Sequence, residues 1–179
     1  MIYMGIDAST QSTGWCVFED KTLVRYEKIV CFDTEKDWRE RIIYMVNHLS
    51  PIVREMNPDI ILIEDVPLKS VGLKTLLILG VLQGALLGMA STYNISVEFI
   101  PVSTWRSQCG LFDGTNAGKE RDKMKQKSIE LVNNIYGLNL CYKSSSSRKN
   151  DDDISDSILI CQSYISPIDK KTFGRNVSI

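Results

Sequence analysis

Four acidic residues are far apart in the sequence but stand where a fold can bring them together. Asp7 follows the apolar run 2–6, Glu64 follows the apolar run 60–63, and Asp153 and Asp156 are one helical turn apart. A carboxylate at the end of a buried strand is costly to desolvate unless a positive group pairs with it. The set therefore predicts a shared cation. Ligation by oxygen alone indicates Mg²⁺ or Mn²⁺ and not zinc.

Phosphodiester hydrolysis is the chemistry that such a carboxylate set can support. Two divalent ions about 3.5–4 Å apart can activate water, neutralise the phosphate and stabilise the leaving oxygen. Asp7 is the expected bridging ligand because the tip of a central strand is rigid, and Glu64, Asp153 and Asp156 would complete the set. Asp152 is an alternative to Asp153. Taken alone, the acidic run 151–153 is also typical of a helix N-terminus.

A basic segment lies between the second and third acidic positions. Residues 115–149 carry more basic than acidic side chains, although the whole chain has a net charge of -1. We expect this segment to hold a polyanion such as DNA; the alternative is an ordinary solvated helix surface. The residues predicted to bind DNA are Lys119, Arg121, Lys125, Lys127, Lys143 and Arg148.

The elements that must position these residues follow from periodicity. Alternating and continuous apolar runs predict strands at 2–7, 14–18, 23–32, 60–64 and 95–100, the first three forming an antiparallel meander. Three- and four-residue spacing predicts helices at 35–56, 73–90, 103–109, 119–136 and 152–165. Pro51 should kink or split the first helix. Trp105 beside Arg106 is interpreted as core packing or as a stacking contact near DNA.

Length and composition are those of an ordinary globular domain. With 179 residues, 44% apolar and 24% charged, the chain predicts one domain over 1–166 and a tail at 167–179. The five cysteines form no CxxC pair and no signal peptide is evident, which favours reduced thiols in the cytoplasm. The apolar stretch 71–90 is a weak membrane candidate. Gly80, Gly84 and Gly88 share one helical face there, which either packs on the sheet or meets a second subunit.

Together these motifs resemble a known family. The chain is similar to RuvC-type Holliday junction resolvases in three motifs. These are Gly5-Ile6-Asp7 with Ser9, Thr13 and Gly14, then Ile-Glu-Asp-Val at 63–66, and then Asp153-x-x-Asp156 before an apolar helix. The resemblance implies an α/β, ribonuclease H-like fold, in which a mixed sheet combines the meander with parallel strands between helices. It also implies a homodimer through the 71–90 helix.

The same resemblance implies an activity and assigns residues to it. Two Mg²⁺ ions, replaceable by Mn²⁺, would support paired nicking of four-way DNA junctions, with Asp7, Glu64, Asp153 and Asp156 as ligands and catalytic residues. A lysine that the family carries near its active site matches Lys123, or Lys125 or Lys127 after a small shift. Cellular members carry an aromatic residue where this chain has Pro-Leu-Lys at 67–69. This departure indicates a phage or viral member, acting in the host cytoplasm on junctions and other branched DNA.

Three other functions remain as alternatives. A ribonuclease H that cuts RNA in hybrids would have the same fold. The run Gly-Ile-Asp-Ala-Ser-Thr at 5–10 also resembles the phosphate loop of sugar kinases and actin-like ATPases, but those proteins need two lobes around the nucleotide. A non-catalytic junction-binding protein would not need the intact acidic set.

Overall fold

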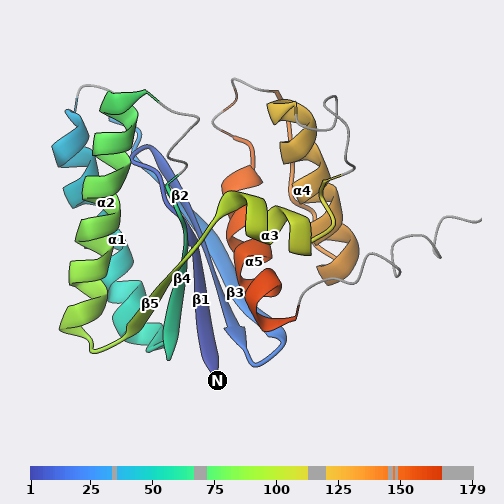
Figure 1. Cartoon of the computed structure of the whole chain (residues 1–179), viewed down its shortest axis with the longest axis horizontal. Coiled ribbons are helices and arrows are strands. Elements are labelled where there is room, and N and C mark those ends of the chain that lie inside the picture. Colours follow the sequence, from blue (N-terminus) through green and yellow to red (C-terminus); the bar gives the residue numbers. More distant parts are fainter. Residues whose placement is uncertain (34–35, 67–71, 113–119, 145–146, 148, 167–179) are drawn as a thin grey trace, which may run out of the picture.

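A five-stranded mixed sheet separates the helices into two layers (Figure 1). The computed structural model describes residues 1–33, 36–66, 72–112, 120–144, 147 and 149–166. The strand order is β3-β2-β1-β4-β5. The strands are β1 (Ile2–Asp7), β2 (Ser12–Glu19), β3 (Thr22–Val30), β4 (Ile60–Glu64) and β5 (Ser96–Ile100). The helices are α1 (Trp38–Met56), α2 (Leu73–Thr92), α3 (Val102–Gln108), α4 (Arg121–Tyr136) and α5 (Asp152–Ile165).

The predicted combination of a meander and parallel strands is confirmed. β1, β2 and β3 are antiparallel neighbours, whereas β4 pairs in parallel with both β1 and β5. Ile6 of β1 lies beside Ile63 of β4, so these two strands end at the same edge of the sheet. Asp7 and Glu64 are the next residues on these strands and therefore emerge together.

Alternation along the strands assigns each side chain to a layer. Met4, Ile6, Ile61 and Ile63 belong to the core under α1 and α2. Ile60 and Leu62 belong to the opposite core, with residues of α3, α4 and α5. Asp7 and Glu64 follow this alternation onto the α5 face of the sheet.

The first helix differs from its prediction in where it begins and in how it passes Pro51. It begins at Trp38 because Asp37 and Glu40 form a capping box, in which the Asp37 carboxylate accepts from the Glu40 amide at 3.0 Å and the Glu40 carboxylate accepts from the Asp37 amide at 2.8 Å. The helix runs through Pro51, so of the two predicted outcomes, a kink or a split, the split is wrong. Pro51 is exposed, and water can therefore bond the carbonyl that lacks a helical donor.

The other boundaries agree with the prediction to within a few residues. β2 extends beyond the predicted strand at both ends, and α5 matches its predicted range. α4 begins at Arg121, while Lys119, Arg148, the stretch 67–69 and the tail 167–179 lie outside the described residues.

α2 is covered on one side only. Leu82, Leu86 and Met89 are buried against the sheet, whereas Leu73, Leu77, Val81 and Leu87 are exposed. Gly80, Gly84 and Gly88 also face open space, so they do not pack on the sheet. Leu73–Thr92 is long and apolar enough to cross a membrane by length and composition, a test that a helix of a globular protein can also pass.

Candidate functional site

The predicted carboxylates come from three elements that meet at one edge of the sheet. Asp7 ends β1 and Glu64 ends β4, the neighbouring parallel strand. Asp153 and Asp156 belong to the first turns of α5, which packs across β1, β2 and β4. The helix thus brings its two acids over the ends of the strands.

Two glycines let α5 approach the sheet this closely. A β-carbon at Gly14 of β2 would come within 2.0 Å of the Asp153 carbonyl oxygen. A β-carbon at Gly5 of β1 would come within 2.3 Å of the Ser157 carbonyl oxygen. No other residue type leaves room for a helix backbone at these points. The glycines of the sequence motif therefore set the height of α5 above the strands.

The acids form one electrostatic cluster. Burial raises the pKa of Asp7 well above its usual range, and repulsion from Glu64, Asp156, Asp153 and Asp152 raises it further, in that order. Asp153 therefore acts on Asp7 more strongly than Asp152 does. Burial also raises the pKa of Asp156 to about 7, although Arg106 and a hydrogen bond from Ser128 lower it.

Neutral donors hold the three carboxylates that surround Asp7. Trp105 Nε1 donates to Glu64 Oε2 at 2.9 Å. Ser12 Oγ donates to Asp153 Oδ2, and Ser128 Oγ donates to Asp156 Oδ1. A guanidinium also lies close by, because Nη2 of Arg106 is 3.9 Å from Asp156 Oδ2. Sequence reasoning did not foresee these partners, although Trp105 follows soon after β5, which ends at this same edge.

The donor chemistry of this cluster fits a hard divalent cation. All four predicted ligands are carboxylates, and the pKa values of Glu64 and Asp156 stay raised by burial although Arg106 lowers both. In their ionised forms these carboxylates would repel one another, so a bound divalent cation would favour the charged state. Within the described residues, no group of three or more His, Cys, Asp or Glu side chains lies close enough to hold an ion as they stand.

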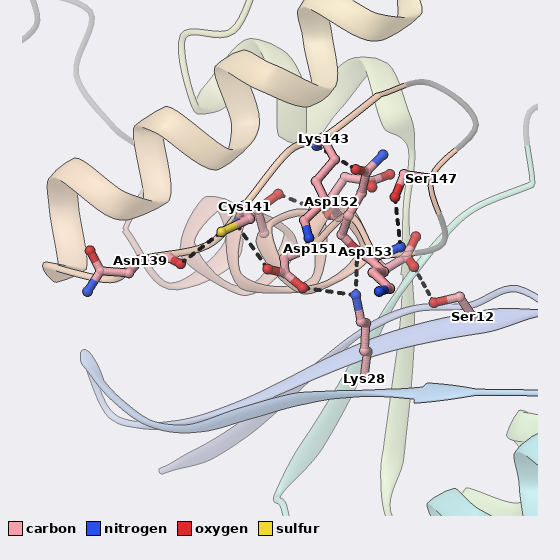
Figure 2. Close-up of polar contacts among 12 residues, drawn as sticks. Ser12, Lys28, Asn139, Cys141, Lys143, Ser147, Asp151, Asp152 and Asp153 are labelled. Carbon is pink, nitrogen blue, oxygen red and sulfur yellow. Dashed lines mark hydrogen bonds and ion pairs between the residues drawn. The ribbon is translucent and has the colours of Figure 1, made fainter.

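A second polar network fixes the start of α5 (Figure 2). Lys28 Nζ of β3 lies 2.9 Å from Asp151 Oδ1, and the Cys141 amide donates to Asp151 Oδ2 at 2.9 Å. Lys28 also donates to the Asn150 carbonyl. Asp151 therefore joins β3, the segment before α5 and α5 itself, and its side chain does not cap the helix.

The three consecutive aspartates have different partners. Asp151 bonds to Lys28, and Asp153 accepts from Ser12 (Figure 2). Asp152 pairs with Lys125 of α4. Asp152 is buried and is already neutralised by a cation. Burial raises the pKa of Asp153, and its hydrogen bond from Ser12, together with Lys125 and Lys28, lowers it.

The basic residues of α4 point in different directions. Lys125 reaches the acidic cluster through Asp152, and its side chain is 22% exposed. Lys123 is 54% exposed and pairs with Glu120 at 3.0 Å, away from the acids. Arg121 and Lys143 are also exposed, and Lys127 is partly exposed. The structure thus brings Lys125, and not Lys123, beside the candidate site.

Two hollows flank the cluster. Asp7 and Glu64 line a small cavity with residues of α2, among them Leu82 and Gln83. Part of Asp7 is accessible from this cavity, although its carboxyl lies deep enough for burial to dominate its pKa. A polar hollow of about 280 Å³ lies beside Asp153 and is lined by residues that include Gln11 and Asn150.

Comparisons with known proteins establish the fold. No protein-family model and no curated protein matches the sequence. Among solved structures, RuvC of Thermus thermophilus in complex with a Holliday junction aligns with a TM-score of 0.68 at 14% identity, over 91% of this chain and 92% of that chain. The fold is ribonuclease H-like. It confirms the fold class that the motifs implied.

Two further resolvases share this architecture. The Fowlpox virus resolvase in complex with Holliday junction DNA aligns with a TM-score of 0.57 at 17% identity, over 92% of this chain and 97% of that one. The yeast mitochondrial Holliday junction resolvase Ydc2 gives 0.57 at 15% identity, over 91% and 77%. At these identities the likeness is one of fold.

Proposed function

We propose that the chain is a metal-dependent DNA endonuclease that resolves four-way junctions by paired nicking. The observation that carries this proposal is the meeting of four carboxylates at one edge of a ribonuclease H-like sheet. Asp7 and Glu64 end the neighbouring parallel strands β1 and β4, and Asp153 and Asp156 lie on α5, which packs across these strands. A cluster of buried, repelling carboxylates at a cleft is typical of a functional site. Structural likeness to junction resolvases supports the substrate class.

In this proposal Asp7, Glu64, Asp153 and Asp156 hold two Mg²⁺ ions, with Mn²⁺ able to substitute. When bound, the ions would supply an activated water and neutralise charge on the phosphate. Asp7 is the proposed bridging ligand because it stands at the centre of the electrostatic cluster. Asp153 is preferred to Asp152 because Asp152 is already paired with Lys125.

Lys125 takes the role of the lysine beside the active site. It is partly buried, and it lowers the pKa of Asp153. Lys123 is assigned to DNA binding instead. The backbone phosphates of the junction arms would meet the basic residues of α4 and the segments around it. Besides Lys123, these are Lys119, Arg121, Lys127, Lys143 and Arg148.

Two copies of the chain would cut the two strands symmetrically. We propose that the dimer forms through α2, whose exposed apolar side chains and open glycine face support close contact between copies. We further propose a phage or viral protein that acts in the host cytoplasm. All five cysteines are free thiols, as expected in a reducing compartment.

One cleavage experiment tests the function. The purified chain is incubated with a four-way junction, a replication fork, a linear duplex and an RNA–DNA hybrid, each with Mg²⁺, Mn²⁺ or EDTA. We expect symmetric nicks on the junction with either ion and none with EDTA, and no cleavage by Asp7→Asn under any condition. Cleavage confined to the RNA strand of the hybrid would instead assign a ribonuclease H. Full activity of Asp7→Asn would refute the ligand assignment.

A further inference from the structure

Trp105 is the buried neutral donor of the carboxylate cluster. Its side chain is completely buried, and its Nε1 donates to Glu64 Oε2 at 2.9 Å. An indole N–H can only donate, so the Glu64 carboxylate must be the acceptor, and the bond restricts its rotation. A buried indole is not always bonded, because Trp15 Nε1 is buried without a partner. The bond to Glu64 is therefore a specific feature of the site.

The short helix α3 carries two contacts to the cluster on adjacent residues. Trp105 bonds to Glu64 of β4, while Arg106 lies 3.9 Å from Asp156 of α5. The Arg106 guanidinium also lies 5.0 Å from the centre of the Trp105 ring, in cation–π geometry. Trp105 thus orders Glu64 directly through its N–H. It also orders Arg106, the cation beside Asp156, through the face of its ring.

α3 itself is firmly placed. It follows β5 directly, and the Cys109 thiol that ends it donates to the Leu159 carbonyl of α5 at 3.5 Å. Trp105, Cys109 and Leu159 all belong to the core on this side of the sheet. A donor on such a rigid element holds Glu64 in one conformation before any ion arrives.

We propose that Trp105 is a positioning residue of the metal site, which holds the Glu64 carboxylate toward Asp7. This proposal rests on the proposed function, because it takes Glu64 to be a metal ligand. A neutral donor suits this role better than a lysine would, because it orients the carboxylate without supplying the positive charge that the ion must bring. Hydrogen-bonding partners of ligands typically change metal affinity by about 10–100-fold when they are removed.

The first test is the affinity for Mn²⁺ alone, measured by calorimetry on the full chain without DNA. Trp105→Phe keeps an aromatic ring and removes the N–H, and we expect a dissociation constant at least about tenfold higher. Trp15→Phe is the matched control, because Trp15 lies in the opposite core and its N–H has no partner. We expect it to bind Mn²⁺ as the parent does. Equal affinity of Trp105→Phe and the parent would overturn the proposal.

The second test does not depend on the folding of the Trp105 variant. The indole N–H resonances are recorded by ¹⁵N NMR for the metal-free parent and for Glu64→Ala. We expect the Trp105 signal to move when its acceptor is removed, while those of Trp15 and Trp38 stay. An unmoved Trp105 signal would overturn the proposal.

The outcomes separate this proposal from the proposed function. A parent chain that binds Mn²⁺ but cleaves no branched DNA refutes the resolvase function and leaves the role of Trp105 to be decided by the affinities. A parent chain that binds no Mn²⁺ overturns both the metal mechanism and the role of Trp105. If the parent chain binds Mn²⁺ and cleaves junctions, and Trp105→Phe binds Mn²⁺ as tightly as the parent, only the role of Trp105 is overturned.

Discussion

Gly14 lies directly against the main chain of Asp153, so that a β-carbon at Gly14 would come within 2.0 Å of the Asp153 carbonyl oxygen. In the sheet, Gly14 is also the partner of Asp7. Gly14 is therefore a neighbour of both Asp7, through strand pairing, and Asp153, through packing against α5. The close contact between sheet and helix occurs at the point where the candidate ligands meet.

Gly14→Ala is expected to damage both stability and activity. The methyl group would meet backbone atoms, which cannot rotate away, so α5 must move off β2. We expect the free energy of unfolding to fall by about 1–3 kcal/mol or more, and cleavage to fall further than stability because Asp153 moves with the helix. Urea unfolding and junction cleavage measure the two effects.

Gly72→Ser is the control for this substitution. A β-carbon at Gly72 meets open space, and serine is a better helix N-cap than glycine for α2, which begins at the next residue. We expect unchanged cleavage and equal or slightly higher stability. If Gly14→Ala behaved like Gly72→Ser, the close approach of α5 would not be required for the site.

The raised pKa of Asp7 predicts how the stability of the metal-free chain depends on pH. The folded chain keeps a proton on this carboxyl at pH values where the unfolded chain, with a pKa near 3.8, has lost it. Folding therefore becomes less favourable as pH rises above about 4 and through the folded pKa. Asp156, with a pKa of about 7, extends this loss through neutral pH.

Asp7→Asn removes the buried acid whose ionisation opposes folding, and it should therefore stabilise the metal-free chain. We expect the variant to unfold at a higher temperature than the parent in EDTA, with an advantage that grows between pH 5 and pH 8. One pKa unit corresponds to about 1.4 kcal/mol, so an advantage of at least this order is expected at pH 8. Mg²⁺ should stabilise the parent more than the variant. If the stability advantage of Asp7→Asn shrank with rising pH, the pKa of Asp7 would not be raised in the folded chain.

The sequence predicted the four carboxylates because each follows or begins an element with a clear apolar pattern. Asp7 and Glu64 end continuous apolar runs, and parallel strands that end together bring such residues to one edge. Gly5 and Gly14 were part of the recognised motif, although their packing role appeared only when α5 was placed over them. Roles for these residues in catalysis remain predictions.

The partners of the carboxylates could not be predicted in the same way. Trp105, Ser128 and Ser12 contact the acids through tertiary packing, and no local pattern distinguishes them from other core or turn residues. Periodicity places Lys123 and Lys125 on different sides of α4, but it does not show that the Lys125 side faces Asp152 of α5. Periodicity also could not decide whether α1 continues through Pro51, because the apolar spacing is the same on both sides of the proline.

Lys125 and Lys123 offer a matched pair of substitutions on one helix. Lys125→Met removes the partner of buried Asp152, and we expect at least about a tenfold loss in the cleavage rate at saturating junction. Lys123→Met should leave that rate unchanged and reduce the salt dependence of junction binding by about one counterion. Single-turnover cleavage and binding at several salt concentrations separate the two effects. If Lys123→Met slowed cleavage and Lys125→Met did not, Lys123 and not Lys125 would be the lysine of the active site.

Val81 and Val24 test the surface through which two copies would meet. Both are exposed valines, at 42% and 45%, but Val81 lies on the apolar face of α2 and Val24 on β3. We expect the parent chain to sediment as a dimer and Val81→Glu to dissociate at least about tenfold more readily, because a charge buried without a partner costs more than 1 kcal/mol. Val24→Glu should remain dimeric, and sedimentation velocity over a range of concentrations measures both. A monomeric parent chain, or a Val81→Glu dimer as tight as the parent, would show that the exposed face of α2 serves another purpose. We also expect the monomeric Val81→Glu chain to make unpaired nicks, whereas the dimeric parent and Val24→Glu make paired nicks. This result would show that symmetric cleavage depends on this face of α2.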